Sequence, residues 1–592
     1  MTAVTVSPSA EIDLPPGTRY RMRAPSGRLL PDPRTRFQPD GVHGPSEVID
    51  PDAYAWGDDG WRGLELEDLV IYELHVGTFT DAGTFRSAVE GLDELAALGV
   101  TAVELMPVSP VPGRWNWGYD GVSLFATKEQ YGRPDDLKAL VDACHARGLA
   151  LILDVVYNHF GPEGNYLAEF GAYFDEGTLT PWGPALDFSP GGPARAYVVD
   201  NARMWLDEFR VDGLRLDAVQ FMFDAQGADS GSAAGSAAAN GGNGLAAALP
   251  ESRRHITAEI GAAAREVESR TGRRKLLFGE SNVYDAELLA PLALDSGSAA
   301  GDTGVDNESG SAAALPESRP GDATRGSGFD ALWCDDFLYA VHFLLTGEQR
   351  IIRRFAGPAD VAECLERGAL FDGPPGGRTR MTGPRLDLSR LVWSIQNHDL
   401  VGNDPRGRRM TEHAGPAAHR AAAALMLLYP AVPLLFMGEE FASRTPFHFF
   451  TDFGDEHLRQ SVVEGRRAES PDLDWSEFVD PTGEESFTLS RRGPQSAGDA
   501  AMVAWYAALI GLRKEWRAAG LLSGEAMTVG FDAAADVYRL TYEAAGRRAG
   551  VVVRLAAEGA ADAAVEVPGE VRLASTSDAA TFRARDAVAW EG

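Results

Sequence analysis

From about residue 70 onward, short β-rich runs alternate along the chain with stretches of helical periodicity. This alternation limits the fold strongly, because neighbouring parallel strands must be joined by a crossover, which is usually a helix. There are eight candidate strands: Val70–Phe79, Ala102–Pro107, Ala150–Tyr157, Gly213–Val219, Leu276–Glu280, Phe329–Cys334, Leu391–Gln396 and Val432–Met437. Eight strands with about as many helices predict an α/β fold of the (β/α)8 type, a TIM barrel enlarged by loops.

Helical patterns fill the connections between these strands and follow the last one. They cover Phe85–Leu98, Asp135–Arg147, Arg195–Phe209, Ile256–Arg270, Asp285–Ala290, Asp335–Leu345, Ala417–Tyr429 and Met502–Trp516. We therefore assign residues 61–520 to the barrel.

The two ends of the chain have a different pattern. Residues 521–592 predict a small antiparallel β-domain with strands at Val537–Tyr542, Ala549–Leu555, Val565–Val567 and Val571–Leu573. Residues 1–60 hold few alternating runs and many prolines, too little for an independent sandwich. We expect a shortened N-terminal β remnant there.

Two low-complexity segments, 225–250 and 292–327, interrupt the barrel pattern. They share DSGSAAG (229–235 and 295–301) and AAALPESR (246–253 and 312–319), each pair 66 residues apart, which favours one insert placed twice. With almost no large apolar residues, such segments cannot offset their ordering entropy, and we expect them to be mobile. The first follows the fourth strand, at the end where a barrel carries its active site.

The charge of the chain excludes some partners. Its 592 residues include 54 Lys+Arg and 87 Asp+Glu, a formal net charge of −33. Nucleic acids and anionic membranes need basic faces, so neither is expected as a partner. The apolar run Ala421–Met437 contains Pro430 and Pro433, which favours a buried helix and strand over a membrane span. The first residues lack the basic and apolar regions of a signal peptide, which predicts a cytoplasmic protein.

The three cysteines, Cys144, Cys334 and Cys364, are too few for a disulfide framework and form no CxxC pair. No His/Cys cluster has the spacing of metal ligands, so we expect no catalytic metal and no cofactor. The sequence leaves open whether loop carboxylates bind a structural calcium ion.

Polar residues interrupt the apolar strands where these strands end. The fourth strand ends in Arg215 and Asp217, the fifth in Glu280, and the seventh in His398 and Asp399. A single acid at a strand end is most often a helix cap or a loop ligand. Functional side chains of a (β/α)8 barrel nevertheless gather at the carboxyl ends of its strands, so three acids arriving there are expected to meet.

Crowded carboxylates split their pKa values, so one can stay ionised while another keeps a proton. Retaining glycoside hydrolysis needs such a pair, a nucleophile and a general acid. Asp217 has Arg215 beside it, which suits the ionised nucleophile. Glu280, near the apolar Phe278, is better placed to be the general acid, and Asp399 could hold sugar hydroxyls and stabilise the oxocarbenium-like state.

Four segments resemble, in order and spacing, the four short regions of the α-amylase superfamily, glycoside hydrolases of family 13: Asp154–His159, Gly213–Val219, Phe278–Ser281 and Gln396–Asp399. Within it, the chain is most similar to the maltooligosyltrehalose trehalohydrolases. The similarity lies in 116–148, 154–167 and MGEEFASRTPFHFFTDF at 437–453, and also in EDLVIYELHVGTFT at 67–80 and LWCDDF at 332–337.

This resemblance implies hydrolysis of the α-1,4 bond next to the terminal trehalosyl unit of a maltooligosaccharide, which releases trehalose, downstream of a synthase that makes this unit. By matching positions, Asp217 is the nucleophile, Glu280 the acid/base and Asp399 the stabiliser of the transition state. The implied substrate contacts are Arg215, His159 and His398, with Tyr119 stacking on the sugar and Gln220 where relatives usually carry a histidine.

For some residues, two interpretations are open. Trp117 reads equally well as a packed aromatic residue, and Asp154 as a residue that holds Arg215. Asp335 and Asp336 either contact substrate or cap the sixth helix. The alternatives for function are a glycogen branching enzyme with the same acids, and a catalytically impaired glucan-binding relative. The short N-terminal part, the inserts and Gln220 depart from the family and keep the last one open.

Overall fold

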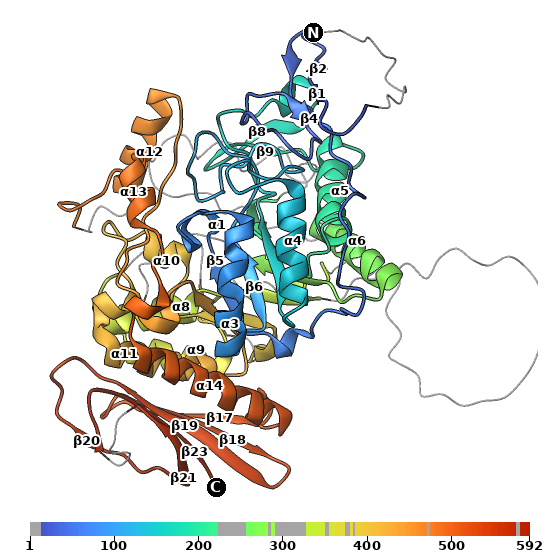
Figure 1. Cartoon of the computed structure of the whole chain (residues 1–592). Coiled ribbons are helices and arrows are strands. Elements are labelled where there is room, and N and C mark those ends of the chain that lie inside the picture. The colour runs from blue at the N-terminus through green and yellow to red at the C-terminus, as the bar shows by residue number, and fades with distance from the viewer. Residues whose placement is uncertain are drawn as a thin grey trace, which may run out of the picture.

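The eight predicted strands close into one parallel barrel and follow one another around it in sequence order. Figure 1 shows this barrel from the side in a computed structural model of the chain. Its strands are β5 (Ile71–Leu74), β6 (Ala102–Leu105), β7 (Ala150–Val155), β10 (Gly213–Leu216), β11 (Leu276–Glu280), β12 (Ala331–Trp333), β15 (Leu391–Ser394) and β16 (Val432–Phe436). The predicted fold class, a (β/α)8 barrel, is confirmed.

The structure describes residues 14–222, 256–281, 284, 286–290, 327–349, 355–372, 379–382, 385–469, 474–575 and 581–592. The predicted inserts at 225–250 and 292–327 lie outside these residues, apart from Ser327. Within the described ranges, every helix is too short or too polar to cross a membrane.

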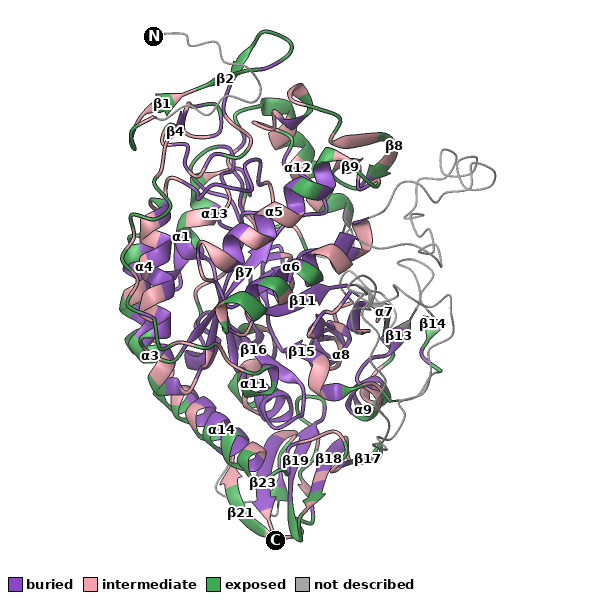
Figure 2. Ribbon diagram, turned by 90° about the vertical axis from the view of Figure 1, so that its right-hand side faces the viewer, coloured by how far each residue is buried: buried purple, intermediate pink, exposed green. Residues whose placement is uncertain are grey.

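Helices cover the outside of the barrel. They are α2 (Phe85–Ala88), α3 (Leu92–Leu98), α4 (Pro134–His145), α5 (Pro193–Asp207), α6 (Ile256–Thr271), α7 (Ala286–Leu289), α8 (Asp336–Thr346), α9 (Pro358–Arg367), α11 (Met410–Leu427) and α14 (Ala500–Ala518). In α4, Pro134 occupies the first turn, where its missing N–H costs nothing, and Leu137, Leu140, Val141 and Cys144 form the buried stripe. Figure 2 shows the strands buried at the centre and the exposed faces on outer helices such as α6.

The first strand is shorter than the predicted Val70–Phe79. It ends at Leu74, and the chain turns into the helical turn α1 (Val76–Phe79), where the N–H groups of Thr78 and Phe79 donate to His75 O. Alternating apolar residues suit a strand or a buried turn equally over so short a run, and here the turn's own hydrogen bonds decide.

The helix before the last barrel strand begins earlier than predicted. It starts at Met410 rather than at Ala417 and bends at Gly415, whose φ is 80°. Pro416 follows and has no N–H to donate, so the helix breaks its hydrogen-bond ladder there. A second helix, α9, was not predicted in the connection between β12 and β15.

Four elements cover the carboxyl end of the barrel, at the top of Figure 1, and none of them was predicted. The hairpin β8 (Phe174–Thr180)–β9 (Gly183–Leu186) follows β7. Both α12 (Glu456–Glu469) and α13 (Glu484–Leu489) follow β16. These elements lie at the end of the barrel where the strands that carry the predicted acids end.

The C-terminal residues form an antiparallel sheet in the order β17 (Met527–Asp532), β18 (Val537–Ala544), β19 (Arg547–Leu555), β23 (Arg585–Glu591), β21 (Glu570–Ala574). The indole N–H of Trp516 in α14 donates to Glu591 of β23 at 2.7 Å, which attaches the sheet to the barrel. The strand predicted at Val565–Val567 is wrong: the chain makes only the two-residue pairing of β20 (Ala563–Ala564) with β22 (Thr581–Phe582) before Pro568.

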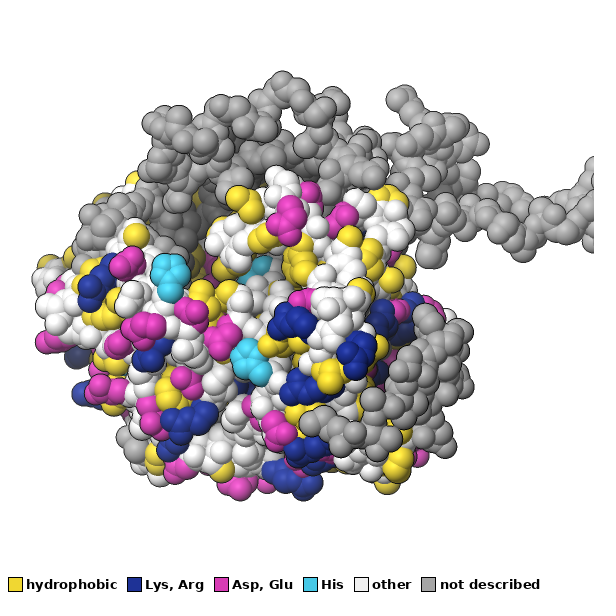
Figure 3. All heavy atoms as spheres, turned by 90° about the horizontal axis from the view of Figure 1, so that it is seen from above, with side chains coloured by type: hydrophobic (Ala, Val, Ile, Leu, Met, Phe, Trp, Pro, Cys, Tyr) yellow, Lys and Arg dark blue, Asp and Glu magenta, His cyan; other side chains and the backbone are white. Residues whose placement is uncertain are grey.

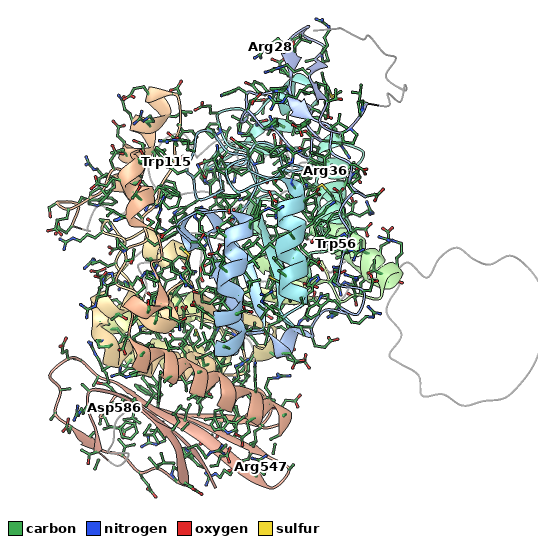
Figure 4. All side chains as sticks on the ribbon, viewed as in Figure 1. Arg28, Arg36, Trp56, Trp115, Arg547 and Asp586 are labelled. Atoms are coloured by element: carbon green, nitrogen blue, oxygen red, sulfur yellow. The ribbon has the colours of Figure 1, made fainter. Side chains whose placement is uncertain are left out.

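The N-terminal part contains two short pairings, β1 (Arg19–Tyr20) with β4 (Ser46–Glu47) and β2 (Met22–Arg23) with β3 (Leu29–Leu30). Arg36 binds Glu208, just after α5, at 2.8 Å. Figure 4 places Arg28 and Arg36 at the upper end of the molecule and Arg547 and Asp586 in the sheet at the opposite end. The division of the chain at residues 60 and 520 stays a prediction.

A buried charge network closes the amino end of the barrel. The ring of His145 bridges two acids, with Nδ1 2.8 Å from Asp58 Oδ2 and Nε2 2.9 Å from Asp212 Oδ2. Arg273 Nη1 lies 2.6 Å from Asp58 Oδ2, and Trp61 stacks on the His145 ring with the centroids 4.8 Å apart. The segment before the barrel is thereby fastened to α4 and to the start of β10.

Candidate active site

The predicted nucleophile and general acid lie around one guanidinium. Arg215 in β10 donates through Nη1 to Asp217 Oδ1 at 2.9 Å, and its Nη2 is 3.3 Å from Glu280 Oε2 at the end of β11. The backbone turns sharply after Asp217, with Ala218 at a φ of 42°, a region that residues other than glycine rarely adopt. This turn aims the Ala218 N–H at Glu280 Oε2, 2.6 Å away.

Arg215 is itself fixed by its surroundings. Its side chain is 1% exposed and also donates to Asp154 Oδ2 at 2.8 Å. The register of β10 and β7 places Asp154 directly beside Arg215, and the guanidinium lies 4.3 Å from the centre of the Trp333 ring. The contact at Asp154 is the one expected of a residue that holds Arg215.

The two predicted catalytic carboxylates differ in their electrostatic surroundings. Burial raises the pKa of Glu280 to about 8, and the carboxylates of Asp217, Asp399 and Asp335 add to this shift while Arg215 opposes it. Asp217 accepts hydrogen bonds on both oxygens, from Arg215 and, at 3.1 Å, from Asn158 Nδ2. Such bonds favour a negatively charged group, so one carboxyl can attack while the other holds a proton.

His398 carries a positive charge in this arrangement. Its Nδ1 is 2.5 Å from Glu73 Oε1, and its Nε2 is 2.8 Å from the Tyr119 hydroxyl, which donates to Asp154 Oδ2 at 2.7 Å. Because the hydroxyl donates its hydrogen bond to Asp154, it can only accept from His398, so both ring nitrogens of His398 must donate. Burial alone would favour the neutral ring, but the Glu73 and Asp399 carboxylates raise the pKa of His398 to about 9.

The exposed fractions of the charged side chains differ, and they indicate the side from which a substrate can reach the acids. The exposed fraction rises from 1% at Arg215 to 11% at Glu280, 12% at Asp217 and 36% at Asp399. Asp399 Oδ1 lies 3.6 Å from His398 Nε2. The end of the molecule above them, seen in Figure 3, carries acidic, basic and hydrophobic side chains side by side.

Three predicted sugar contacts lie next to aromatic rings. Tyr119 stacks on His398, with the centroids 5.1 Å apart, and the buried His159 stacks on Trp182 at 4.4 Å. Burial lowers the pKa of His159 to about 4, so its ring is neutral. Gln220 is half-buried, just after the nucleophile, and its Oε1 has no hydrogen-bond partner among the described residues.

The two neighbouring acids after β12 point in different directions. Asp335 precedes α8 without a side-chain capping bond, and burial, with Asp399 nearby, raises its pKa to about 7. Asp336 accepts the backbone N–H groups of Leu370 and Phe371 at 2.7 and 3.0 Å. Asp335 thus lies near the acids, while one oxygen of Asp336 binds the backbone at Leu370 and Phe371, and a substrate contact of either residue stays a prediction. Trp117 is packed too, with its indole N–H donating to His448 O at 2.9 Å.

The sequence reasoning missed three residues of this region. Glu73 in VIYELHV and Glu104 in TAVELMP are buried acids inside apolar strands, and an acid in such a run is a signal in itself. Trp182 lies on the unpredicted β8–β9 connection and is 43% exposed beside His159. An isolated tryptophan in a Pro- and Gly-rich loop gave no comparable signal.

Among the described residues, one group, Glu348, Asp404 and His413, has the donor types of a metal site. Arg408 Nη2 is 2.8 Å from Asp404 Oδ2 and 3.3 Å from Glu348 Oε1. A guanidinium thus occupies the place that a cation would take, and we assign no metal here.

The chain is similar to known proteins of the α-amylase type. A family model described as alpha amylase, catalytic domain, matches residues 50–178. The malto-oligosyltrehalose trehalohydrolase of Arthrobacter ramosus is 40% identical over 499 residues, covering 82% of this chain and 77% of that protein. The one of Saccharolobus solfataricus is 36% identical, covering 84% and 78%.

The crystal structure of a Salmonella typhimurium protein assigned as an alpha amylase is similar over almost the whole chain. It matches with a TM-score of 0.78 and 32% identity, covering 98% of this chain and 91% of that one. A 1,4-alpha-glucan branching enzyme of Rhodospirillum rubrum is 33% identical, but it covers only 34% of this chain.

Proposed function

The chain belongs to the malto-oligosyltrehalose trehalohydrolase family of the α-amylase superfamily, and we propose that Asp217, Glu280 and Asp399 perform its reaction. The reaction is retaining hydrolysis of the α-1,4 bond next to the terminal trehalosyl unit of maltooligosyltrehalose, and it releases trehalose. The observation that carries the assignment is the contact of one buried guanidinium, Arg215, with both Asp217 and Glu280.

In the first step, Glu280 donates its proton to the glycosidic oxygen while Asp217 attacks the anomeric carbon. The bond to the trehalosyl unit breaks, trehalose leaves with the proton, and the rest of the sugar chain is esterified to Asp217. With a pKa of about 8, Glu280 still holds this proton at neutral pH. Arg215 holds Asp217 in place through a charge-assisted hydrogen bond to Oδ1.

In the second step, the Glu280 carboxylate takes a proton from water, and the oxygen of this water attacks the same anomeric carbon. The ester to Asp217 breaks, the maltooligosaccharide leaves with its original anomeric configuration, and Glu280 is protonated again. Asp399, the most exposed of the three acids, accepts hydrogen bonds from sugar hydroxyls as positive charge develops on the ring.

The remaining contacts suit a neutral sugar. We assign sugar contacts to His398 and Arg215, which bring positive charge beside the acids while their N–H groups bind Glu73, Tyr119 and the carboxylates, and Tyr119 offers an aromatic ring. We assign further substrate contacts to His159, Gln220 and Asp335. The mixed surface in Figure 3 fits a substrate without charge, since no single sign of charge has to cover it.

The partner of this reaction is a synthase that converts the reducing end of a maltooligosaccharide into a trehalosyl unit. No contact surface for it is assigned, because a free product can pass between the two enzymes. A cytoplasmic location agrees with three buried cysteines that are all free thiols.

Incubation with maltotriosyltrehalose tests the function. Equal amounts of trehalose and maltotriose are expected, and amylose alone should give no new α-1,6 branches. Branches on amylose without trehalose release would point to a branching enzyme. Binding of the substrate without any product would instead point to a catalytically impaired relative.

A further inference from the structure

Below the catalytic acids, the barrel interior contains a carboxyl group that the reaction does not use. Glu104 lies in the middle of β6 and is 2% exposed. Its register neighbours are Glu73 on β5 and Ile152 on β7, two residues before Asp154. Side chains two apart on a strand share a face, so Glu73, Glu104 and Asp154 point into the same interior.

The cations of this interior are already directed at other acids. Arg215 contacts Asp154, Asp217 and Glu280 through its two terminal nitrogens. His398 contacts Glu73 through its backbone N–H and through Nδ1. An ionised Glu104 would therefore be a buried charge that has to share the already engaged Arg215 and His398 with other acids, which is a costly arrangement.

Three buried polar atoms of this layer have no hydrogen-bond partner among the described residues: Glu104 Oε1, Asp154 Oδ1 and Arg215 Nε. The Asp154 oxygen is an acceptor that lacks a donor. A carboxylate at position 104 could accept from the Arg215 Nε–H but would leave Asp154 Oδ1 without a donor, whereas a neutral carboxylic acid can accept from Nε and also supply the missing O–H. Buried polar atoms of native proteins are nearly always satisfied, either directly or by an internal water.

We propose that Glu104 is a neutral carboxylic acid that donates its proton to Asp154 Oδ1, directly or through one internal water. Asp154 would then be held on both oxygens, by Glu104 on one side and by Tyr119 and Arg215 on the other. Glu104 is thus a positioning residue, which acts through Asp154 and Arg215 on the pair Asp217 and Glu280.

The electrostatic surroundings support this assignment. Burial, with the Glu73 and Asp154 carboxylates, holds the pKa of Glu104 well above its usual range, although Arg215 and His398 oppose the shift. Among the described residues, these four charged groups act on Glu104 from β5, β7, β10 and the turn after β15.

Infrared difference spectroscopy tests the protonation state directly, and it does so whatever substrate the enzyme uses. The spectrum of the whole protein minus that of Glu104→Gln should contain the carbonyl band of a neutral carboxylic acid, shifted in D2O. This band should persist at pH 9, where Glu280, with its pKa of about 8, is largely ionised. The exposed Glu90→Gln is the matched control and should leave no such band. A carboxylate band at position 104 would overturn the proposal.

Kinetics test the positioning role, which rests on the proposed function. Glu104→Gln keeps a neutral donor for Asp154, so kcat should stay within about threefold of the wild type. Glu104→Leu removes the donor, so kcat should fall by about tenfold or more and the pH profile should change. Equal kcat and equal pH profiles for the Gln and Leu variants would refute the positioning role. If the Leu variant does not fold, the Gln variant still decides, because a large loss with a neutral isostere means that the charge was needed.

Discussion

Two buried charge networks lie at opposite ends of the same barrel, and they differ in their balance of charges. At the amino end, Asp58 and Asp212 face His145, Arg273 and Arg210. At the carboxyl end, Arg215 and His398 face seven acids: Glu73, Glu104, Asp154, Asp217, Glu280, Asp335 and Asp399. Most of these side chains are buried at either end, so the surplus of acids is what distinguishes the two networks.

The pKa shifts follow this difference. Burial by itself opposes ionisation at Asp58, but hydrogen bonds from Arg273 and His145 lower its pKa, and His145 lowers that of Asp212 in the same way. At the other end, burial raises the pKa of Asp154 to about 6, of Asp335 to about 7 and of Glu280 to about 8. Buried acids with paired charges stabilise a fold, while surplus acids keep protons that can be used in catalysis.

Asp217→Asn should have the largest effect on activity. The amide keeps the shape of the side chain but cannot form the sugar ester, so kcat should fall by more than about a thousandfold. Trehalose release and the melting temperature should be measured together. Equal turnover by the variant and the wild type would refute the assignment of the nucleophile.

Asp58→Asn should act in the opposite way, on stability and not on chemistry. It leaves Arg273 and His145 without their shared acid, and a broken buried pair costs about 3–5 kcal/mol of unfolding free energy. Because folding lowers the pKa of Asp58, its contribution is present at neutral pH and is lost as the pH falls. Denaturant unfolding at several pH values measures this loss. If the variant has a changed kcat under conditions where it is fully folded, the network at the amino end does more than stabilise the fold, which would contradict this account.

Asp335→Asn should move the alkaline limb of the pH–rate profile. Activity is expected to fall as the pH rises through about 8, because Glu280 then loses the proton it must donate. Removing the neighbouring charge of Asp335 lowers the pKa of Glu280, so this limb should shift down by about half a unit to one unit. Asp336→Asn is the matched control: it should weaken the hold on Leu370 and Phe371 and leave the limb in place.

Gln220→His should give the smallest effect. Gln220 is half-buried next to the nucleophile turn and makes no bond there through Oε1 among the described residues. A histidine at this position should change KM by about two- to fivefold and leave kcat within about twofold. A large change in kcat would mean that position 220 takes part in the chemistry and not only in binding.

The difference between the ends also explains what could be predicted from the sequence. The strands and the position of the three acids could be predicted, because polar residues that end apolar strands gather at one edge of a parallel barrel. The different surroundings of Asp335 and Asp336 could not be predicted. Both acids stand at the start of the same helix, and only the folded structure shows that the Leu370 backbone binds Asp336. Glu104 and Glu73 were not predicted, because functional residues were expected only at the ends of strands and these two acids lie within strands.

Azide rescue of two variants tests the central assignment most directly. With a maltooligosyl α-fluoride, whose leaving group needs no proton from Glu280, the intermediate on Asp217 still forms in Glu280→Ala, and azide should replace water and give a glycosyl azide with the original α configuration. In Asp217→Ala azide should attack the substrate itself, while Glu280 protonates the leaving oxygen, and give the β-glycosyl azide. Opposite anomers from the two variants are the predicted result. The same anomer from both, or the reverse assignment, would contradict the roles of Asp217 and Glu280.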